Sequence, residues 1–107
     1  MKYQVTLNLL LYNENRSNHL RGSIEVVLPF APTVGMQIRY KDMYPLRIKR
    51  VAWLTDQESF DCTVEEELCS YEFCRGDDIE ELIDRYDILR DAKEYGWTGF
   101  DNIYRDD

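Results

Sequence analysis

Hydrophobic and polar residues alternate along most of the first 73 residues of the chain. The segment 3–12 shows this pattern clearly, because nearly every second residue is apolar and the residues between are mainly polar. A period of two is typical of a β-strand with one face in a core and the other in water. The same pattern predicts further strands over about residues 23–30, 35–41, 46–54 and 59–73.

Turn-forming residues separate the expected strands. The segment 13–21 is polar and rich in Asn and Ser, so we expect a long exposed turn there. Pro29 ends the second strand, because proline has no backbone N–H to donate to a sheet. In the fourth strand the apolar phase moves by one residue near Lys49 and Arg50, which predicts a β-bulge.

The hydrophobic period changes from two to three or four after Gly76. Asp77 followed by Glu80 three residues later resembles a capping box, which marks the start of a helix. We therefore expect one amphipathic helix over about residues 78–95, with Gly96 at its end. Its apolar stripe consists of Ile79, Leu82, Ile83, Tyr86 and Leu89.

The segment 97–104 is too aromatic for a disordered tail, and we expect Trp97 and Phe100 to pack back on the domain. Together these elements predict an α+β fold in a single domain of residues 1–107. The expected architecture is a five-stranded antiparallel sheet, or a partly open small barrel, with one C-terminal amphipathic helix packed on it.

The apolar phases of the expected elements should form one core. The predicted core residues are Tyr3, Val5, Leu7, Leu9, Ile24, Val26, Leu28, Ile38, Ile48, Val51, Trp53, Phe60, Cys62, Val64, Leu82, Ile83 and Tyr86. Ile88 lies opposite the stripe of the expected helix. We therefore expect a homodimer in which Ile88 is a contact residue.

Composition is that of an ordinary globular domain, with 44% hydrophobic and 32% charged residues. No segment approaches the ~18 continuous apolar residues that a membrane helix needs. The N-terminus lacks the pattern of an export signal, so the three cysteines are interpreted as reduced thiols of a cytoplasmic protein.

Charge is distributed unevenly along the chain, whose formal net charge is −8. Residues 1–55 hold eight bases and three acids, a net charge of +5. Residues 56–107 hold five bases and 18 acids, a net charge of −13. Such asymmetry bears on binding partners rather than on the fold.

Residues that usually carry catalysis or bind metals occur in arrangements that favour no such chemistry. Three cysteines and one histidine lack the spacing of a zinc site. Cys74 precedes the expected helix, but Asp77 and Asp78 follow it and oppose ionisation of its thiol. His19 lies in the polar segment 13–21 and is interpreted as a solvated loop residue. The sequence therefore predicts a protein without enzymatic activity, metal or cofactor.

Two charged surfaces are candidate binding sites. The first would engage a basic protein, as an inhibitor, immunity protein or adaptor does. It comprises the helix acids Asp77, Asp78, Glu80, Glu81, Asp84, Asp87 and Asp91. The second is the hairpin 39–50 of a small barrel, which would bind nucleic acid through Arg39, Lys41, Arg47 and Lys49.

The first of these alternatives is favoured, because the net charge of −8 repels phosphate. A third alternative is a ligand-binding or enzymatic domain with a pocket between the sheet and the helix.

Overall fold

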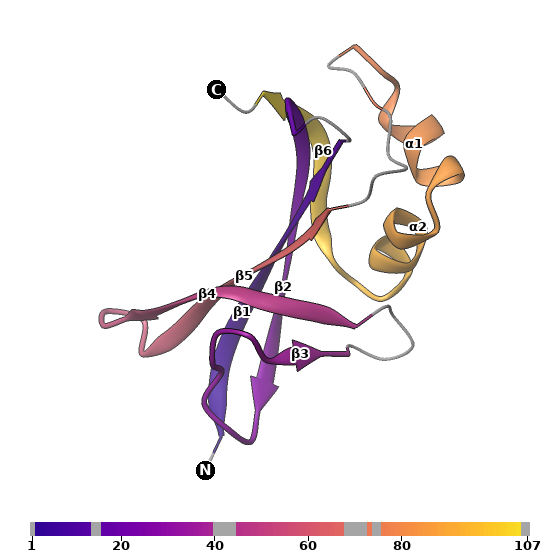
Figure 1. The fold of residues 1–107 in the computed structure, drawn as a ribbon. Coiled ribbons are helices and arrows are strands. Elements are labelled where there is room, and N and C mark those ends of the chain that lie inside the picture. The colour runs from indigo at the N-terminus through magenta and orange to yellow at the C-terminus, as the bar shows by residue number, and fades with distance from the viewer. Residues whose placement is uncertain (1, 14–15, 40–44, 68–72, 74–75, 106–107) are drawn as a thin grey trace.

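Six strands form one twisted sheet, and two short helices lie on one of its faces (Figure 1). The computed structural model describes residues 2–13, 16–39, 45–67, 73 and 76–105. The elements in chain order are β1 (Tyr3–Tyr12), β2 (Asn18–Leu28), β3 (Gln37–Ile38), β4 (Leu46–Leu54), β5 (Ser59–Glu67), α1 (Ile79–Arg85), α2 (Asp87–Glu94) and β6 (Thr98–Arg105). The predicted α+β class is confirmed. Neither described helix combines the length and apolar character that crossing a bilayer requires.

The sheet is mixed and open, whereas the sequence predicted five antiparallel strands or a partly open barrel. Its strand order is β3-β4-β5-β1-β2-β6. β5 runs parallel to β1, and the other neighbours are antiparallel. Alternation predicted most strands but not this pairing, because side chains alternate with the same period in parallel and antiparallel strands. The predicted bulge is confirmed by a register shift between Ile48 and Arg50.

Strand boundaries differ from the prediction at several places. β2 begins at Asn18, so the predicted turn over 13–21 is wrong for its second half. β3 comprises two residues, and residues 40 and 41 of the predicted strand 35–41 lie outside the described part of the chain. β5 ends at Glu67, and most of the predicted continuation to residue 73 also lies outside it.

The predicted single helix over 78–95 is two helices, because the chain is extended at Tyr86 with φ −110° and ψ 118°. The Tyr86 N–H donates to the Leu82 carbonyl and ends α1, and its own carbonyl accepts from Leu89 at the start of α2. This break changes the helical phase. Leu82 of α1 and Ile88, Leu89 and Ala92 of α2 are therefore all buried.

Burial of Ile88 removes the observation on which its predicted role as a dimer contact rested. On one straight helix Ile88 would lie opposite the apolar stripe, but the break at Tyr86 turns α2 so that only 8% of Ile88 is exposed. A side chain committed to its own core offers little surface to a second chain. The homodimer itself stays a prediction that no longer rests on this residue.

The predicted tail over 97–104 contains the edge strand β6, which pairs with β2. Trp97 and Phe100 are buried, which confirms that they pack on the domain. Phe100 has φ +59° and lies against Gly22, where the β2–β6 register shifts. Gly99 has φ +103° and approaches the Arg21 carbonyl so closely that a Cβ there would lie 2.8 Å from the oxygen. Gly99 is therefore required by a close backbone approach, and Gly22 by the Phe100 ring packed against it.

The core lies between the helices and the apolar side of the central strands. Its fully buried members include Val5, Leu7, Leu9, Leu11, Leu20, Ile48, Val64, Leu82, Leu89 and Phe100. Trp53 was predicted in this core but is 51% exposed. Its side chain lies on the predicted face of β4, because the centroids of the Trp53 and Phe60 rings are 4.9 Å apart. The β4–β5 turn, however, projects away from both helices, so no helix covers Trp53 (Figure 1).

Candidate functional site

The predicted acidic residues all lie on or next to α1 and α2. We call Asp77, Asp78, Glu80, Glu81, Asp84, Asp87 and Asp91 the acidic helical surface. Six of them are exposed, and Asp91 is half-buried. Leu82, Leu89 and Ala92 point the other way into the core, so helical periodicity alone places most of these carboxylates in water.

Some of these carboxylates take part in interactions within the helices. Asp78 is the N-cap of α1, where its Oδ1 accepts from the backbone N–H of Glu80 at 3.0 Å. Asp87 forms an ion pair with Arg90 one turn later. Lys93 donates to the Gly99 carbonyl at 2.9 Å and lies 3.5 Å from Asp101. These bases are thus engaged locally, while the residues 77–94 contain eight acids and three bases.

The predicted basic hairpin is only partly described. Arg39, Arg47 and Lys49 are exposed, and Lys41 lies outside the described residues. Arg47 and Lys49 alternate with buried Leu46 and Ile48, so they point away from the core. One Nη1 hydrogen of Arg47 is donated to the Gly35 carbonyl at 3.3 Å.

The bulge in β4 adds a base that the sequence analysis did not include in this site. Because Lys49 is the extra residue between Ile48 and Arg50, Arg50 is exposed and lies opposite Thr63 of β5. A predicted bulge next to two bases was the signal that could have identified it.

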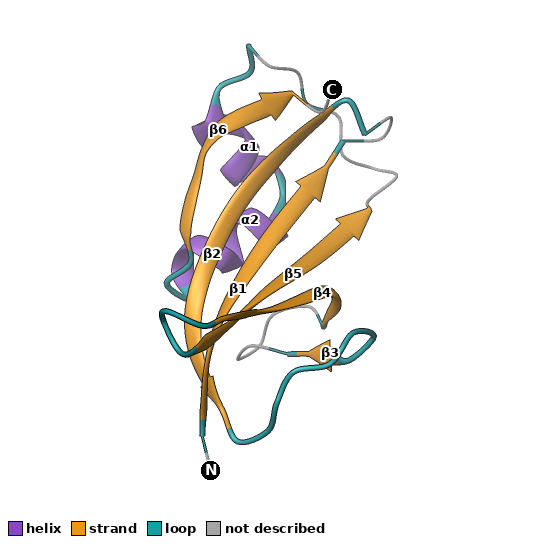
Figure 2. Ribbon diagram, turned by 90° about the vertical axis from the view of Figure 1, so that its left-hand side faces the viewer, coloured by secondary structure: helices purple, strands orange, loops and turns teal. Residues whose placement is uncertain are grey.

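The helices and the exposed bases of β4 lie on opposite sides of the sheet. Figure 2 shows α1 and α2 behind the strands, and the face toward the viewer is not covered by either helix. That outer face carries mainly polar side chains. Asn8, for example, donates to Asp61 at 2.6 Å and to the Cys62 carbonyl at 3.1 Å. The fold therefore separates the acidic helices from the bases of β4.

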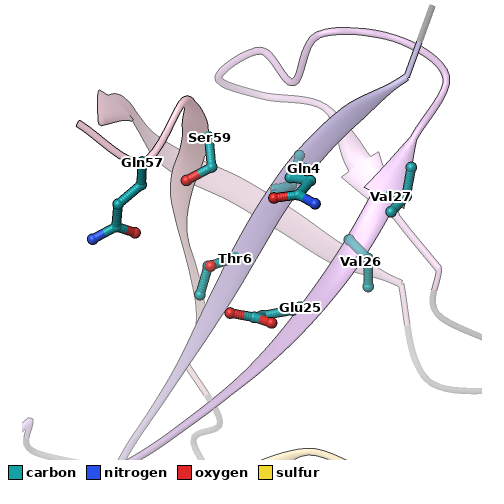
Figure 3. A pocket seen from close by; sticks show the side chains of 8 residues that line it. Gln4, Thr6, Glu25, Val26, Val27, Gln57 and Ser59 are labelled. Carbon is teal, nitrogen blue, oxygen red and sulfur yellow. The ribbon is translucent and has the colours of Figure 1, made fainter. Parts of the chain in front are cut away.

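Shallow hollows occur along the strands. One of about 350 Å³ is lined on the outer face by Gln4, Thr6, Glu25, Gln57 and Ser59, with Val26 and Val27 beside them (Figure 3). A second, of about 410 Å³, lies between Asn8, Arg21, Asp61 and Thr98. A third, of about 330 Å³, lies between β2 and Ile38. None of these three lies between the sheet and the helices, where the sequence analysis expected a pocket.

Most of the side chains that line the first hollow are polar. The first offers amides, hydroxyls and one carboxylate, which can hydrogen-bond a polar ligand but include neither a thiol nor an imidazole. Among the described side chains, no three His, Cys, Asp or Glu groups gather as metal ligands.

The thiol of Cys62 is buried in the core, where it acts as a packing group. Burial raises the pKa of the Cys62 thiol, and the neighbouring Asp61 carboxylate raises it further. A thiol in such surroundings stays protonated at neutral pH and is a poor nucleophile. Cys69 and Cys74 lie outside the described residues.

His19 occupies a different environment from the solvated loop expected for it. It lies within β2, is 7% exposed, and its ring stacks near Tyr12 of β1 and Tyr104 of β6. The polar composition of its neighbours concealed this position, because the strand β6 that covers it lies about 85 residues further along the chain.

Comparison with known proteins adds no relative: no family model, curated protein or solved structure matches this chain.

Proposed function

We propose that this chain is a non-enzymatic binding module whose acidic helical surface engages a basic protein partner, as an inhibitor, immunity protein or adaptor does. The observation that carries the proposal is the exposure of six of the seven carboxylates, which lie on or next to helices whose other side is buried. Exposed charges contribute little to fold stability, but they steer partners of opposite charge and select among them.

The acidic helical surface also retains repulsion that the fold does not need. Glu80 and Asp84 are four residues apart along α1 and both are exposed. Like charges at this spacing destabilise a helix by about 0.2–0.5 kcal/mol. A surface that keeps such pairs is better explained by an external partner than by stability of the domain.

We expect charge reversal on this surface to slow association with the partner. Basic proteins captured by cross-linking to the immobilised wild-type chain would be identified, purified and tested one by one for association rate. The double variant Glu80→Lys and Asp84→Lys should associate at least about tenfold more slowly at low ionic strength, since electrostatic steering changes on-rates by that order or more.

A matched control distinguishes an effect of the acidic helical surface from an effect of the net charge. Glu25→Lys with Asp56→Lys makes the same change in net charge at two exposed positions outside the helices. This control should retain most of the wild-type association rate. Equal slowing by both double variants would contradict the proposed surface, as would a partner that is itself acidic.

The second candidate function, nucleic-acid binding, is supported by the exposure of Arg39, Arg47, Lys49 and Arg50 in and next to β3 and β4. If it operates, affinity for single-stranded oligonucleotides should fall steeply with salt. Arg47→Glu with Lys49→Glu should then abolish binding in a fluorescence anisotropy titration, while the Glu80→Lys and Asp84→Lys variant binds as well as wild type or better. Our expectation is that the wild-type chain binds no oligonucleotide at physiological salt, because its net charge is −8.

A further inference from the structure

A cluster of aromatic and cationic side chains joins the outer end of β6 to β2, apart from the acidic helical surface. His19 and Arg21 lie on β2 with one residue between them, and Tyr104 of β6 is the register partner of His19. The His19 and Tyr104 rings stack with centroids 5.6 Å apart. The Arg21 guanidinium carbon lies 3.8 Å from the centre of the same Tyr104 ring. Each of the three side chains therefore contacts the other two.

The hydrogen bond inside this cluster determines the charge state of the histidine. Arg21 Nε donates to His19 Nε2 at 3.1 Å. A guanidinium group has donors only, so Nε2 must offer a lone pair and the ring proton must sit on Nδ1. The arrangement therefore requires a neutral imidazole. Protonation would convert Nε2 into a donor and place a second cation beside the guanidinium.

Residues from the neighbouring elements surround the His19–Tyr104 pair. The Tyr12 ring of β1 lies 5.2 Å from the His19 ring, measured between centroids. The guanidinium carbon of Arg16 lies 4.0 Å from the centroid of the Tyr12 ring. On β5 the register position beside Tyr12 is Glu67. The two cations described around the aromatic pair thus oppose a third positive charge at His19, which is 93% removed from solvent.

β6 is attached to β2 in two separate parts. The register between the strands shifts between Leu20 and Gly22, which divides β6 into residues 98–100 and residues 103–105. The buried Phe100 ring packs against Gly22 and anchors the first part. Neither of these two residues has a titratable side chain. The second part pairs with β2 where the cluster lies. Loss of the cluster contacts would therefore loosen residues 103–105 and leave residues 98–100 attached.

We propose that His19, Arg21 and Tyr104 form a pH-sensitive clasp that holds residues 103–105 of β6 on β2 when His19 is neutral and releases them when His19 is protonated. In the released state the His19 imidazole, which stays on β2, is solvated and accepts a proton readily. Acid therefore favours release, because the stability of the attached state decreases as the pH is lowered wherever the released state binds more protons. Histidine is the side chain suited to this role, because it titrates between about pH 5 and 8.

Amide hydrogen exchange of the full chain, followed by NMR, tests the clasp. Protection factors between about pH 7.5 and pH 5.5, corrected for intrinsic exchange, should fall by up to about tenfold at the amides of residues 103–105 that pair with β2, because the released state gains one proton at an imidazole with an ordinary pKa of about 6.5. Protection at residues 98–100 should fall by less than about twofold, a difference within ordinary surface effects. The chain has one histidine, so its C2 proton resonance reports protonation of His19 directly.

Two variants make the result decisive. His19→Gln keeps an acceptor for Arg21 but cannot titrate in this range, so the pH dependence at residues 103–105 should disappear. Arg21→Gln, at an exposed position that should not prevent folding, removes the competing cation and should reduce the dependence even if His19→Gln does not fold. Unchanged protection of wild-type residues 103–105 across this range would overturn the proposal, as would an equal loss in the Arg21→Gln variant.

Discussion

Replacing Gly22 with alanine is expected to destabilise the protein by about 3 kcal/mol or more, at the upper end for overpacked sites. A Cβ at this position would lie 2.1 Å from Cε2 of Phe100. The ring has little freedom to move away, because Phe100 is 1% exposed and its backbone has φ +59°. The clash would therefore act on the contact that anchors β6 to β2.

Urea denaturation of the two single variants and the double variant would measure this effect. Phe100→Leu removes the ring atoms that meet the new methyl group, so Gly22→Ala should cost less in that background than in wild type. Gly76→Ala is the matched control, because a Cβ there meets nothing within 4 Å. Additive costs at Gly22 and Phe100, or equal costs at Gly22 and Gly76, would contradict the proposed contact.

Truncating Leu7 to alanine is expected to lower the free energy of unfolding by about 2–5 kcal/mol, the range for leucines in a closed core. Leu7 is 0% exposed and sits on β1, between Ile24 of β2 and Cys62 of β5. A cavity at this position is surrounded by sheet on both sides and by other buried side chains. It can collapse little, so the cost should be large.

Leu10→Ala is the control for this prediction, because it removes the same atoms from the same strand on the opposite face. Leu10 is half-buried and borders a hollow on the outer face, so its truncation should cost about 1 kcal/mol or less. Chemical denaturation would compare the two midpoints. Similar costs at Leu7 and Leu10 would mean that the outer face is covered as well as the inner one.

The acidic helical surface was predictable because it depends on local periodicity. Once Leu82 and Leu89 are assigned to the core, most acids between them must face water, and the structure places them so. The cluster around His19 was not predictable. Its members come from β2 and β6, and nothing in the composition around His19 indicates that a strand from the C-terminus covers it.

By itself, the sequence determined the local features of this protein. Alternation over 3–12 predicts β1, the phase shift near Lys49 predicts the bulge in β4, and the aromatic tail predicts burial of Trp97 and Phe100. Each is a property of neighbouring residues, whose side chains must divide between core and water within one element.

Only the tertiary structure decided which elements meet. The parallel pairing of β5 with β1 and the attachment of β6 to β2 depend on contacts between distant segments, which strand periodicity does not encode. The break at Tyr86 has the same origin. A straight helix would leave Ile88 in water, and two helices joined by an extended residue bury both Leu82 and Ile88, so burial outweighs the helical hydrogen bonds lost at the break.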